Sequence, residues 1–318
     1  MRGLVLEPKL HLQLNRPKPE LKPQEAIIKV VQAGICSTDL HLIKGYMDFQ
    51  GVLGHEFVGI VDQAPNQPSL IGKRVVGEIN AACRVCETCL QGRPTHCPNR
   101  TTLGIMGRDG AFADYLALPV ANLYPLPEEI SNEQAVFIEP LAAACEIPQL
   151  VTIKPKDRAI VIGDGKLGLL CAQVLVLSGC HVTLLGHHCE NHAWLASKGI
   201  AVTSEIQDIP PGADVVVEAT GSPEGLAMAT KLVRPRGTIV LKSTYHGEIL
   251  VNMTELVIQE ISVIGSRCGP FDPALRLLAG GMIDVEPLIH ARFPLTEGIQ
   301  AMEQATQRGV LKVLLNMA

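Results

Sequence analysis

The segment Ala159–Leu170 reads AIVIGDGKLGLL and places three glycines, in the spacing G-x-G-x-x-G, directly after a short apolar run. The run Arg158–Ile162 predicts a buried strand, and Leu167–Ser178 predicts the helix that follows it. In that context the first glycine permits a tight turn, the second lets a pyrophosphate approach the backbone, and the third lets helix pack on strand. We therefore expect a dinucleotide site rather than an ordinary glycine-rich turn. The motif residues assigned to it are Gly163, Gly165, Lys166, Leu167 and Gly168.

On the C-terminal side of this motif, apolar strands alternate with helical stretches, which is typical of βαβ units and a parallel sheet. The expected strands are Arg158–Ile162, His181–Leu185, Asp214–Glu218 and Thr238–Leu241, and the expected helices are Leu167–Ser178, Glu190–Lys198 and Pro223–Val233. Because these strands are apolar on both faces, the sheet should be covered on both sides. The fold class is therefore α/β, with a doubly wound parallel sheet.

The strand His181–Leu185 ends in Gly186, His187 and His188, where enzymes that use NAD place a carboxylate about twenty residues after the glycines. The missing carboxylate leaves room for a 2′-phosphate, and both histidines could donate to it. We therefore expect NADP to be preferred. The alternative is that the histidines are solvated loop residues and either cofactor binds. Lys242 and Arg267 follow expected strand ends. They contact cofactor phosphate or an anionic substrate, or they are ordinary surface charges.

Before this region, short β-branched segments bounded by glycine and proline predict a loop-rich β-barrel. They include Ala26–Gln32, Val58–Asp62 and Arg74–Gly77. We expect no helix before about Ser131, which could cap a helix that starts near Glu133. After the parallel sheet come helices at Asp272–Ala279 and Glu297–Gln307 and a strand at Leu311–Leu315, and this tail could join either domain.

Four of the ten cysteines lie within fifteen positions, which favours metal binding over disulfides. Cys83, Cys86, Cys89 and Cys97 form C-x2-C-x2-C-x7-C. Four thiolates in one lobe satisfy tetrahedral zinc and leave no open position, which predicts a structural site. Thiols packed in a core are disfavoured because the segment is polar, and a nucleic-acid zinc knuckle is disfavoured because the chain is acidic.

A second group of possible ligands is dispersed along the chain. Cys36 lies in AGICSTDLH, His55 and Glu56 lie in GHEFVG, and Glu139 lies in FIEPLA. Each alone could be a buried thiol, a loop histidine or a carboxylate at a helix start. Together they offer a thiolate, an imidazole and one or two carboxylates, which suits a catalytic zinc that keeps one position open.

The composition limits the classes of partner. With 318 residues the chain is long enough for two domains, and its net charge of -5 and 3% aromatic content argue against nucleic-acid binding. The most apolar stretch, Ala159–Leu185, is interrupted by Asp164, Lys166 and His181, so no membrane span is expected. The N-terminus lacks a signal peptide's apolar core, and we expect a cytoplasmic protein with a small-molecule substrate.

The motifs GICSTDLH, GHEFVG, the four-cysteine lobe, EPLA and GDGKLG occur in the order found in medium-chain zinc dehydrogenases. The chain resembles that family over essentially its whole length. The resemblance implies a GroES-like catalytic domain at 1–140 with a zinc lobe at about 80–100, a Rossmann domain at 141–266, and a return to the catalytic domain at 267–318. It also implies a homodimer or homotetramer, for which Ser262–Ile264 is a candidate edge strand.

By this resemblance, Cys36, His55 and Glu139 are ligands of a catalytic zinc, and Glu56 binds it directly or through water. Thr38 matches the family's hydroxyl relay and His41 its proton shuttle, although His41 could instead be a solvated helix residue. Asp39 either orients a neighbouring group or caps a short helix. A carboxylate as third ligand resembles sorbitol and glucose dehydrogenases, and threonine dehydrogenase is similar.

The implied function is zinc-dependent hydride transfer between NAD(P) and a polyol, sugar or secondary alcohol. Its alternatives are an NADPH-dependent carbonyl reductase and, more distantly, a family member that binds cofactor without turnover. The segment between Cys36 and His55 is short for the family, which implies reduced substrate loops and leaves the substrate open.

Overall fold

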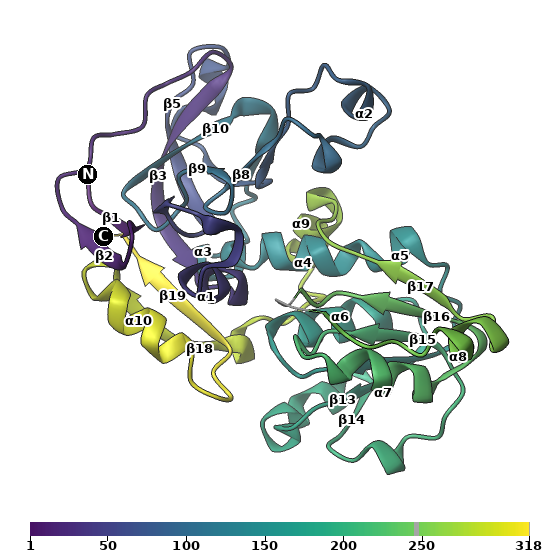
Figure 1. The fold of residues 1–318 in the computed structure, drawn as a ribbon. Helices are drawn as coiled ribbons and strands as arrows, with labels where there is room; N and C mark the ends of the chain where they lie inside the picture. The colour runs from purple at the N-terminus through teal and green to yellow at the C-terminus, as the bar shows by residue number, and fades with distance from the viewer. Residues whose placement is uncertain (245–247, 318) are drawn as a thin grey trace. The chain divides into compact units, whose positions relative to one another are not determined.

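The computed structural model describes residues 1–244 and 248–317, with the side chains of 189 and 190 left aside. The chain divides into two compact units, Met1–Glu139 with Leu275–Ala318 and Pro140–Ala274 (Figure 1). The C-terminal segment of the chain thus returns to the unit that contains the N-terminus.

The first unit is built on a seven-stranded sheet in the order β11-β6-β5-β3-β19-β18, with β10 also paired to β3. These strands are β3 (Glu25–Gly34), β5 (Glu56–Gln63), β6 (Arg74–Gly77), β10 (Tyr115–Pro119), β11 (Leu123–Pro125), β18 (Ile289–Pro294) and β19 (Lys312–Asn316). Because β19 pairs antiparallel with β3, the last strand of the chain lies beside one of the first.

Two three-stranded sheets complete the β-structure of this unit. One has the order β2-β1-β4 and the other β7-β8-β9. Their strands are β1 (Gly3–Leu6), β2 (Leu10–Gln13), β4 (Gly51–Val52), β7 (Asn80–Ala81), β8 (Thr101–Leu103) and β9 (Gly107–Arg108).

Two α-helices precede Ser131, so the expectation of none there was wrong. They are α1 (Ser37–Ile43) and α2 (Glu87–Leu90), and both are too short for a helical apolar stripe to show in the sequence. The start of α1 is fixed instead by Asp39, whose Oδ2 accepts the backbone N–H of Cys36 at 2.8 Å.

The helix capped by Ser131 is confirmed as α3 (Asn132–Val136). The Ser131 hydroxyl accepts the N–H of Gln134 at 3.2 Å, and the Gln134 side chain accepts the N–H of Ser131 at 2.9 Å. The helices that follow are α4 (Ile138–Cys145) and α5 (Ile147–Leu150), and the tail of the first unit contributes α10 (Gly298–Ala305).

The second unit contains a six-stranded parallel sheet in the order β14-β13-β12-β15-β16-β17. Its strands are β12 (Arg158–Ile162), β13 (His181–Leu185), β14 (Ile200–Thr203), β15 (Ala213–Glu218), β16 (Val233–Leu241) and β17 (Ser262–Gly265). The four predicted strands are confirmed. The strand order reverses direction between β12 and β15, and ligands of such sheets bind at that point, beyond the carboxyl ends of the strands.

This unit contains α6 (Lys166–Val176), α7 (Glu224–Leu232) and α8 (Met253–Ile258), and the boundary between the units falls within α9 (Phe271–Ala279). The helix expected at Glu190–Lys198 is instead a 3-10 segment, η5 (Cys189–Lys198), interrupted by non-helical backbone at His192. Helix α6 packs on β12 and β13, and α7 packs on β15 and β16.

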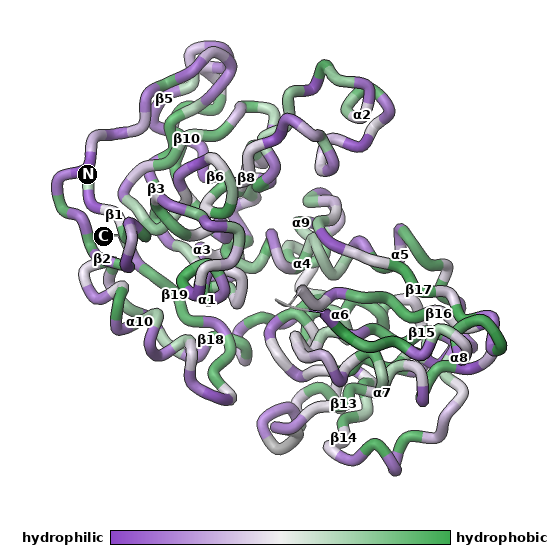
Figure 2. Tube along the Cα trace, in the orientation of Figure 1, coloured by the Kyte–Doolittle hydropathy of each residue, from purple (hydrophilic) through white to green (hydrophobic). Residues whose placement is uncertain are grey.

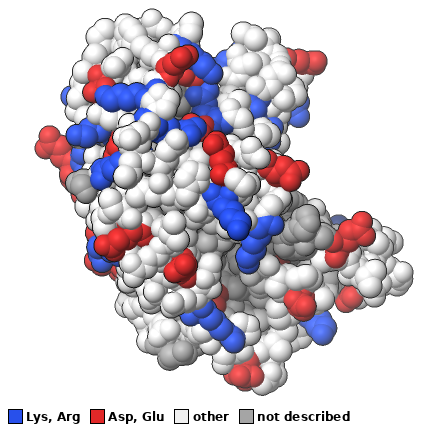
Figure 3. Space-filling model, turned by 60° about the vertical axis from the view of Figure 1, so that its left-hand side comes forward, with Lys and Arg blue, Asp and Glu red and all other residues white. Residues whose placement is uncertain are grey.

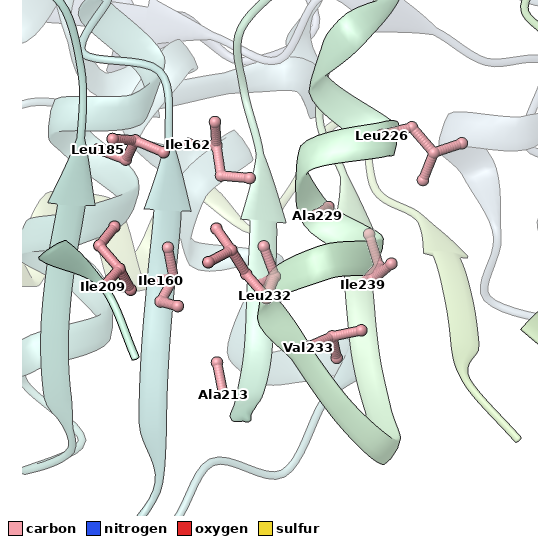
Figure 4. Packing of buried hydrophobic residues seen from close by; sticks show 11 residues of the cluster. Ile160, Ile162, Leu185, Ile209, Ala213, Leu226, Ala229, Leu232, Val233 and Ile239 are labelled. Atoms are coloured by element: carbon pink, nitrogen blue, oxygen red, sulfur yellow. The ribbon is translucent and has the colours of Figure 1, made fainter. Parts of the chain in front are cut away.

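One apolar core joins the sheet of the second unit to α7 (Figure 4). Ile160 and Ile239 project from the sheet at 1% and 0% exposure, and Leu232 and Ala229 of α7 pack against the cluster. Figure 2 shows the green, hydrophobic colour along much of β15 and β16, as strands covered on both faces require.

Within the described residues, no helix is both long and apolar enough to span a bilayer. On the face in Figure 3, acidic and basic side chains are interspersed, and neither sign covers the surface continuously. That face shows no broad basic surface of the kind that nucleic-acid binding requires.

Replacing Leu232 with Ala should destabilise the second unit by about 2–5 kcal/mol, because it leaves a cavity against the sheet. Chemical denaturation followed by circular dichroism measures the change. The matched control is Leu177→Ala, since Leu177 is 40% exposed. Equal effects of the two substitutions would contradict the assignment of Leu232 to the core.

Candidate functional site

The pairing of β3 with β5 brings together residues that lie about twenty positions apart. The strands are antiparallel, and Gly34, the last residue of β3, pairs with Glu56, the first residue of β5. Cys36 follows the end of β3, and His55 precedes the start of β5. The ladder therefore sets the thiol beside the imidazole and the carboxylate.

Cys36, His55 and Glu56 each place one possible ligand atom within 4.8 Å of the other two. His55 and Glu56 are 3% and 1% exposed, so neither group is solvated as a surface residue would be. A thiol, an imidazole and a carboxylate form a donor set that suits zinc. The donor chemistry and its burial thus fit a metal ion at this position.

Asp39 of α1 is fully buried and contacts both Cys36 and His55. Its Oδ2 accepts the N–H of Cys36, while its Oδ1 accepts the N–H of Gly54 at 3.2 Å and lies 3.3 Å from His55 Nδ1. Burial lowers the pKa of His55, but Asp39 and Cys36 outweigh burial and raise the pKa well above its ordinary value. Asp39 therefore caps the helix and also orients the histidine, two roles that the sequence presented as alternatives.

Glu56 is also held by Lys312 of β19, a residue that the sequence reasoning missed. The two side chains form an ion pair, and Lys312 and Glu56 are 0% and 1% exposed. The Lys312 ammonium lies 5.5 Å from the centre of the Phe137 ring. No local sequence signal points to this pair, because 256 residues separate its partners.

Gly34 leaves the space in which this ion pair lies. A Cβ at this position would lie 2.5 Å from Val136 Cγ1, 2.8 Å from Glu56 Oε2 and 3.0 Å from Lys312 Cδ. The last residue of β3 must therefore be small, because the Glu56 carboxylate and the Lys312 side chain pack against the strand at this position.

Glu139 of α4 is not part of the compact group of three, but it interacts electrostatically with it. Burial raises the pKa of Glu139 to about 7. His55 and Lys312 oppose this rise, and Glu56 and Glu78 add to it. Glu78, also missed from the sequence, is anchored by Asn80, whose N–H donates to Glu78 Oε1 at 2.9 Å. A cation among these acids would favour their ionised forms.

Thr38 and His41 lie on α1, three residues apart, and so share a face of the helix. The Thr38 hydroxyl is 3.8 Å from Cys36 Sγ. His41 is half-buried and meets Tyr46 edge-on, with 6.5 Å between ring centres. Burial, with a contribution from Lys44, lowers the pKa of His41.

The other four cysteines also converge. Sγ atoms of Cys83, Cys86, Cys89 and Cys97 lie within 4.8 Å of one another. The separations are 3.5 Å for Cys86–Cys89 and Cys97–Cys83, and 3.8 Å for Cys86–Cys97. Helix α2 and the turn at Pro94–His96 carry the last three sulfurs toward the first.

The thiols of this lobe cannot all ionise together without a cation. Backbone N–H groups of Val85 and Cys86 lower the pKa of Cys83 to about 6. Burial and the neighbouring sulfurs instead raise the pKa of Cys89 to about 12. A divalent metal would compensate the four negative charges, so the donor set fits a closed tetrahedral zinc site.

The glycine loop between β12 and α6 has the geometry of a phosphate cradle. Gly163 has φ +108, a conformation that L side chains rarely adopt. A Cβ on Gly165 would meet nothing within 4 Å, so space is open above the backbone, whereas a Cβ on Gly168 would overlap the carbonyl of Gly163. Lys166 and Leu167 begin α6, whose N-terminus faces this loop.

The residues at the strand ends that were predicted to contact the cofactor differ in exposure and in hydrogen bonding. Gly186 is buried, His187 is exposed and His188 is half-buried, and the His188 N–H donates to Asp164 Oδ2. Lys242 is only 7% exposed and donates to Ala143 O, Ser266 Oγ and Arg267 O at 2.7–3.0 Å. These bonds use the three donors of its ammonium, which ties Lys242 to its own unit. Arg267 is exposed.

Two family models match separate parts of the chain. The alcohol dehydrogenase GroES-like domain matches residues 22–128, and the zinc-binding dehydrogenase domain matches residues 167–280. The first match contains both cysteine-bearing groups, and the second begins at Leu167, in the first turn of α6.

Among relatives, D-arabitol-phosphate dehydrogenase of Enterococcus avium is 30% identical over 93% of this chain and 91% of its own. A zinc-binding dehydrogenase of Sinorhizobium meliloti 1021, solved with NADP, superposes with a TM-score of 0.89 at 29% identity, covering 99% of this chain and 98% of its own. An alcohol dehydrogenase of Escherichia coli CFT073, solved with NADH, has the same TM-score at 26% identity, covering 100% and 99%.

Replacing Lys312 with Met should destabilise the protein by about 3–5 kcal/mol, because it leaves Glu56 buried without its cation. The double variant Lys312→Met with Glu56→Gln should recover much of that loss. Thermal and denaturant unfolding measure both. If the double variant were as unstable as the sum of the two single variants, the carboxylate and the ammonium would not be coupled.

Proposed function

Since the chain belongs to the medium-chain zinc-dependent alcohol and polyol dehydrogenase family, we propose that it transfers a hydride between an alcohol and a nicotinamide cofactor. The substrate class is a secondary alcohol, a polyol or a sugar. The observation that carries the proposal is the convergence of Cys36, His55 and Glu56, with the half-buried Glu139 in electrostatic contact with His55 and Glu56.

Cys36, His55 and Glu139 would hold the catalytic zinc, with Glu56 as an additional or alternative ligand. Zinc bound there supplies Lewis acidity, which lowers the pKa of an alcohol hydroxyl and polarises a carbonyl. A third ligand that is a carboxylate rather than a thiolate keeps the metal more electrophilic, which suits polyols and related alcohols.

The protein's own residues orient the ligands and move the proton. Asp39 fixes the imidazole of His55 and the backbone of Cys36 through contacts of 2.8–3.3 Å. Lys312 pairs with Oε2 of Glu56, so the carboxylate is held toward β19 while its other oxygen would still be able to bind a metal. Thr38 and His41 supply a hydroxyl and an imidazole on one helix face, along which the alcohol proton leaves.

The four-cysteine lobe would hold a second, structural zinc, since four sulfurs leave no position for a substrate. The glycine loop would hold the pyrophosphate of NAD or NADP, and Lys166 and Leu167 place the first turn of α6 against it. The sequence favours NADP on the strength of the missing carboxylate at Gly186. The carboxylate of Asp164, which lies at Gly186, also bears on that choice.

A reductase that consumes NADPH is the second candidate, because the same residues serve both directions of hydride transfer. A family member without turnover would lack a ligand or a fingerprint glycine, and this chain has them all. Initial rates with panels of polyols, secondary alcohols and their carbonyl products, each with both cofactors, separate these possibilities.

Replacing Cys36 with Ala should lower turnover by at least about a thousandfold, because several kcal/mol of transition-state stabilisation depend on the metal. The protein should lose the zinc ion of that site, while its affinity for the cofactor stays the same. Cys180→Ala is the control, since Cys180 is buried outside both groups. Unchanged turnover in Cys36→Ala would refute the zinc chemistry. Cys86→Ser should instead give unfolded or aggregated protein.

For the oligomer, we propose that two copies pair along β17, the last strand in the order of the parallel sheet. Val263 on this strand is 39% exposed, and Val257 and Ile258 of the preceding α8 are 71% and 70% exposed. An unpaired edge beside apolar side chains favours association with a second copy.

Val263→Lys combined with Val257→Glu should shift the protein toward monomers, because charges at an apolar edge oppose pairing. Light scattering after size-exclusion chromatography measures the mass. Leu14→Lys serves as the control, since Leu14 is 59% exposed in the other unit. A wild-type monomer, or an oligomer unaffected by the paired substitutions, would reject this interface.

A further inference from the structure

The end of β13 lacks the carboxylate expected there, but its space is filled from another segment. A Cβ built on Gly186 would overlap Cβ and Cγ of Asp164 and lie 2.5 Å from its Oδ2. Asp164 is the residue between the first two glycines of the fingerprint. Its carboxylate therefore occupies the volume that a side chain at position 186 would take.

This carboxylate is held firmly against the end of the strand. Its Oδ2 accepts the His188 N–H at 2.7 Å and lies 3.6 Å from His192 Nε2, and the Asp164 side chain is 11% exposed. Burial raises the pKa of Asp164, but His192 and the His188 N–H outweigh burial and lower it to about 2. The group is thus negatively charged throughout the neutral pH range.

The other oxygen of Asp164 remains available to a ligand. The contacts of the His188 N–H and of His192 Nε2 both go to Oδ2 rather than Oδ1, and the adjacent Gly165 borders open space. In sheets of this topology the pyrophosphate lies over the second glycine, and the adenosine ribose reaches toward the end of the second strand. Asp164 belongs to the glycine loop, directly before Gly165, and its side chain reaches the end of the second strand at Gly186.

We propose that Asp164 is the residue that selects the cofactor: its carboxylate accepts hydrogen bonds from the adenosine ribose hydroxyls and repels a 2′-phosphate, so that NAD is preferred over NADP. This inference rests on the proposed function. It replaces the preference for NADP, which was drawn from the strand end alone.

Two of the neighbouring basic side chains already have partners, so they do not offset this charge in favour of a 2′-phosphate. The side chain of His192 is 3% exposed, and its Nε2 is directed at the Asp164 carboxylate. The ammonium of Lys242 is bonded to three oxygens. The imidazoles of His187, which is exposed, and His188, which is half-buried, are the histidine side chains that could approach the phosphate.

Binding can be measured apart from turnover, because Trp194 is the single tryptophan and lies on η5, two residues after His192. We expect titration of the zinc-loaded wild-type protein, followed by Trp194 fluorescence or by calorimetry, to give a Kd for NAD about a hundredfold below that for NADP. Asp164→Asn, which keeps an acceptor for the His188 N–H, should reduce that ratio by at least about tenfold. Asp208→Asn, an exposed carboxylate of the same unit, should leave it unchanged.

A swap of the two positions tests the geometry itself. Gly186→Asp alone should be poorly folded, because its side chain would overlap Asp164. The double variant Asp164→Gly with Gly186→Asp returns the carboxylate to the strand and should restore both a cooperative melt and the preference for NAD. A role of Asp164 in folding alone predicts no recovery of cofactor preference.

A wild-type preference for NADP, or a ratio unchanged in Asp164→Asn, overturns the selectivity while leaving the dehydrogenase assignment intact. Folded, zinc-loaded protein that binds neither NAD nor NADP overturns both. The two failures are therefore distinguishable in one set of titrations.

Discussion

Gly34 and Glu56 are paired where β3 and β5 run antiparallel, and the geometry of the candidate zinc site depends on that register. A slip of one residue would turn Glu56 to the other face of the sheet and move His55 away from Cys36. Several contacts fix the register from outside the pair. The Asp39 carboxylate accepts hydrogen bonds from the N–H groups of both Cys36 and Gly54. The N–H of Ile35 donates to the carbonyl of Val313 in the last strand at 2.9 Å.

The acidic side chains around this site outnumber the basic ones. Glu56, Glu78 and Glu139 gather near one buried ammonium, that of Lys312, and one imidazole, that of His55. Removing so many ionisable groups from water is costly, and buried ion pairs seldom offset that cost by their attraction alone. The excess of acid over base is the arrangement expected around a divalent cation, which favours the ionised forms.

The sequence predicted what local pattern determines and missed what tertiary contact determines. Strands β12 and β13 have the bounds that their apolar runs predicted, because a strand covered on both faces is largely apolar. Helix α1 was missed because it has seven residues and is stabilised by the Asp39 cap rather than by an apolar stripe. Lys312 was missed because its partner lies 256 residues away. Convergence of Cys36, His55 and Glu56 could be expected from donor chemistry, yet the position of Glu139 outside their compact group could not.

Both units use a glycine to admit a charged group from elsewhere in the chain. At Gly34 the missing side chain lets Glu56 and Lys312 meet over a strand end, and at Gly186 it lets Asp164 enter from the fingerprint loop. Sequence rules that assign a role to a position assume that the side chain at that position fills its own space. Where the residue is glycine, a neighbour can fill that space instead, and the charge at the site then comes from the neighbour. The absence of a carboxylate at position 186 is thus no measure of the charge at the end of β13, because Asp164 restores it.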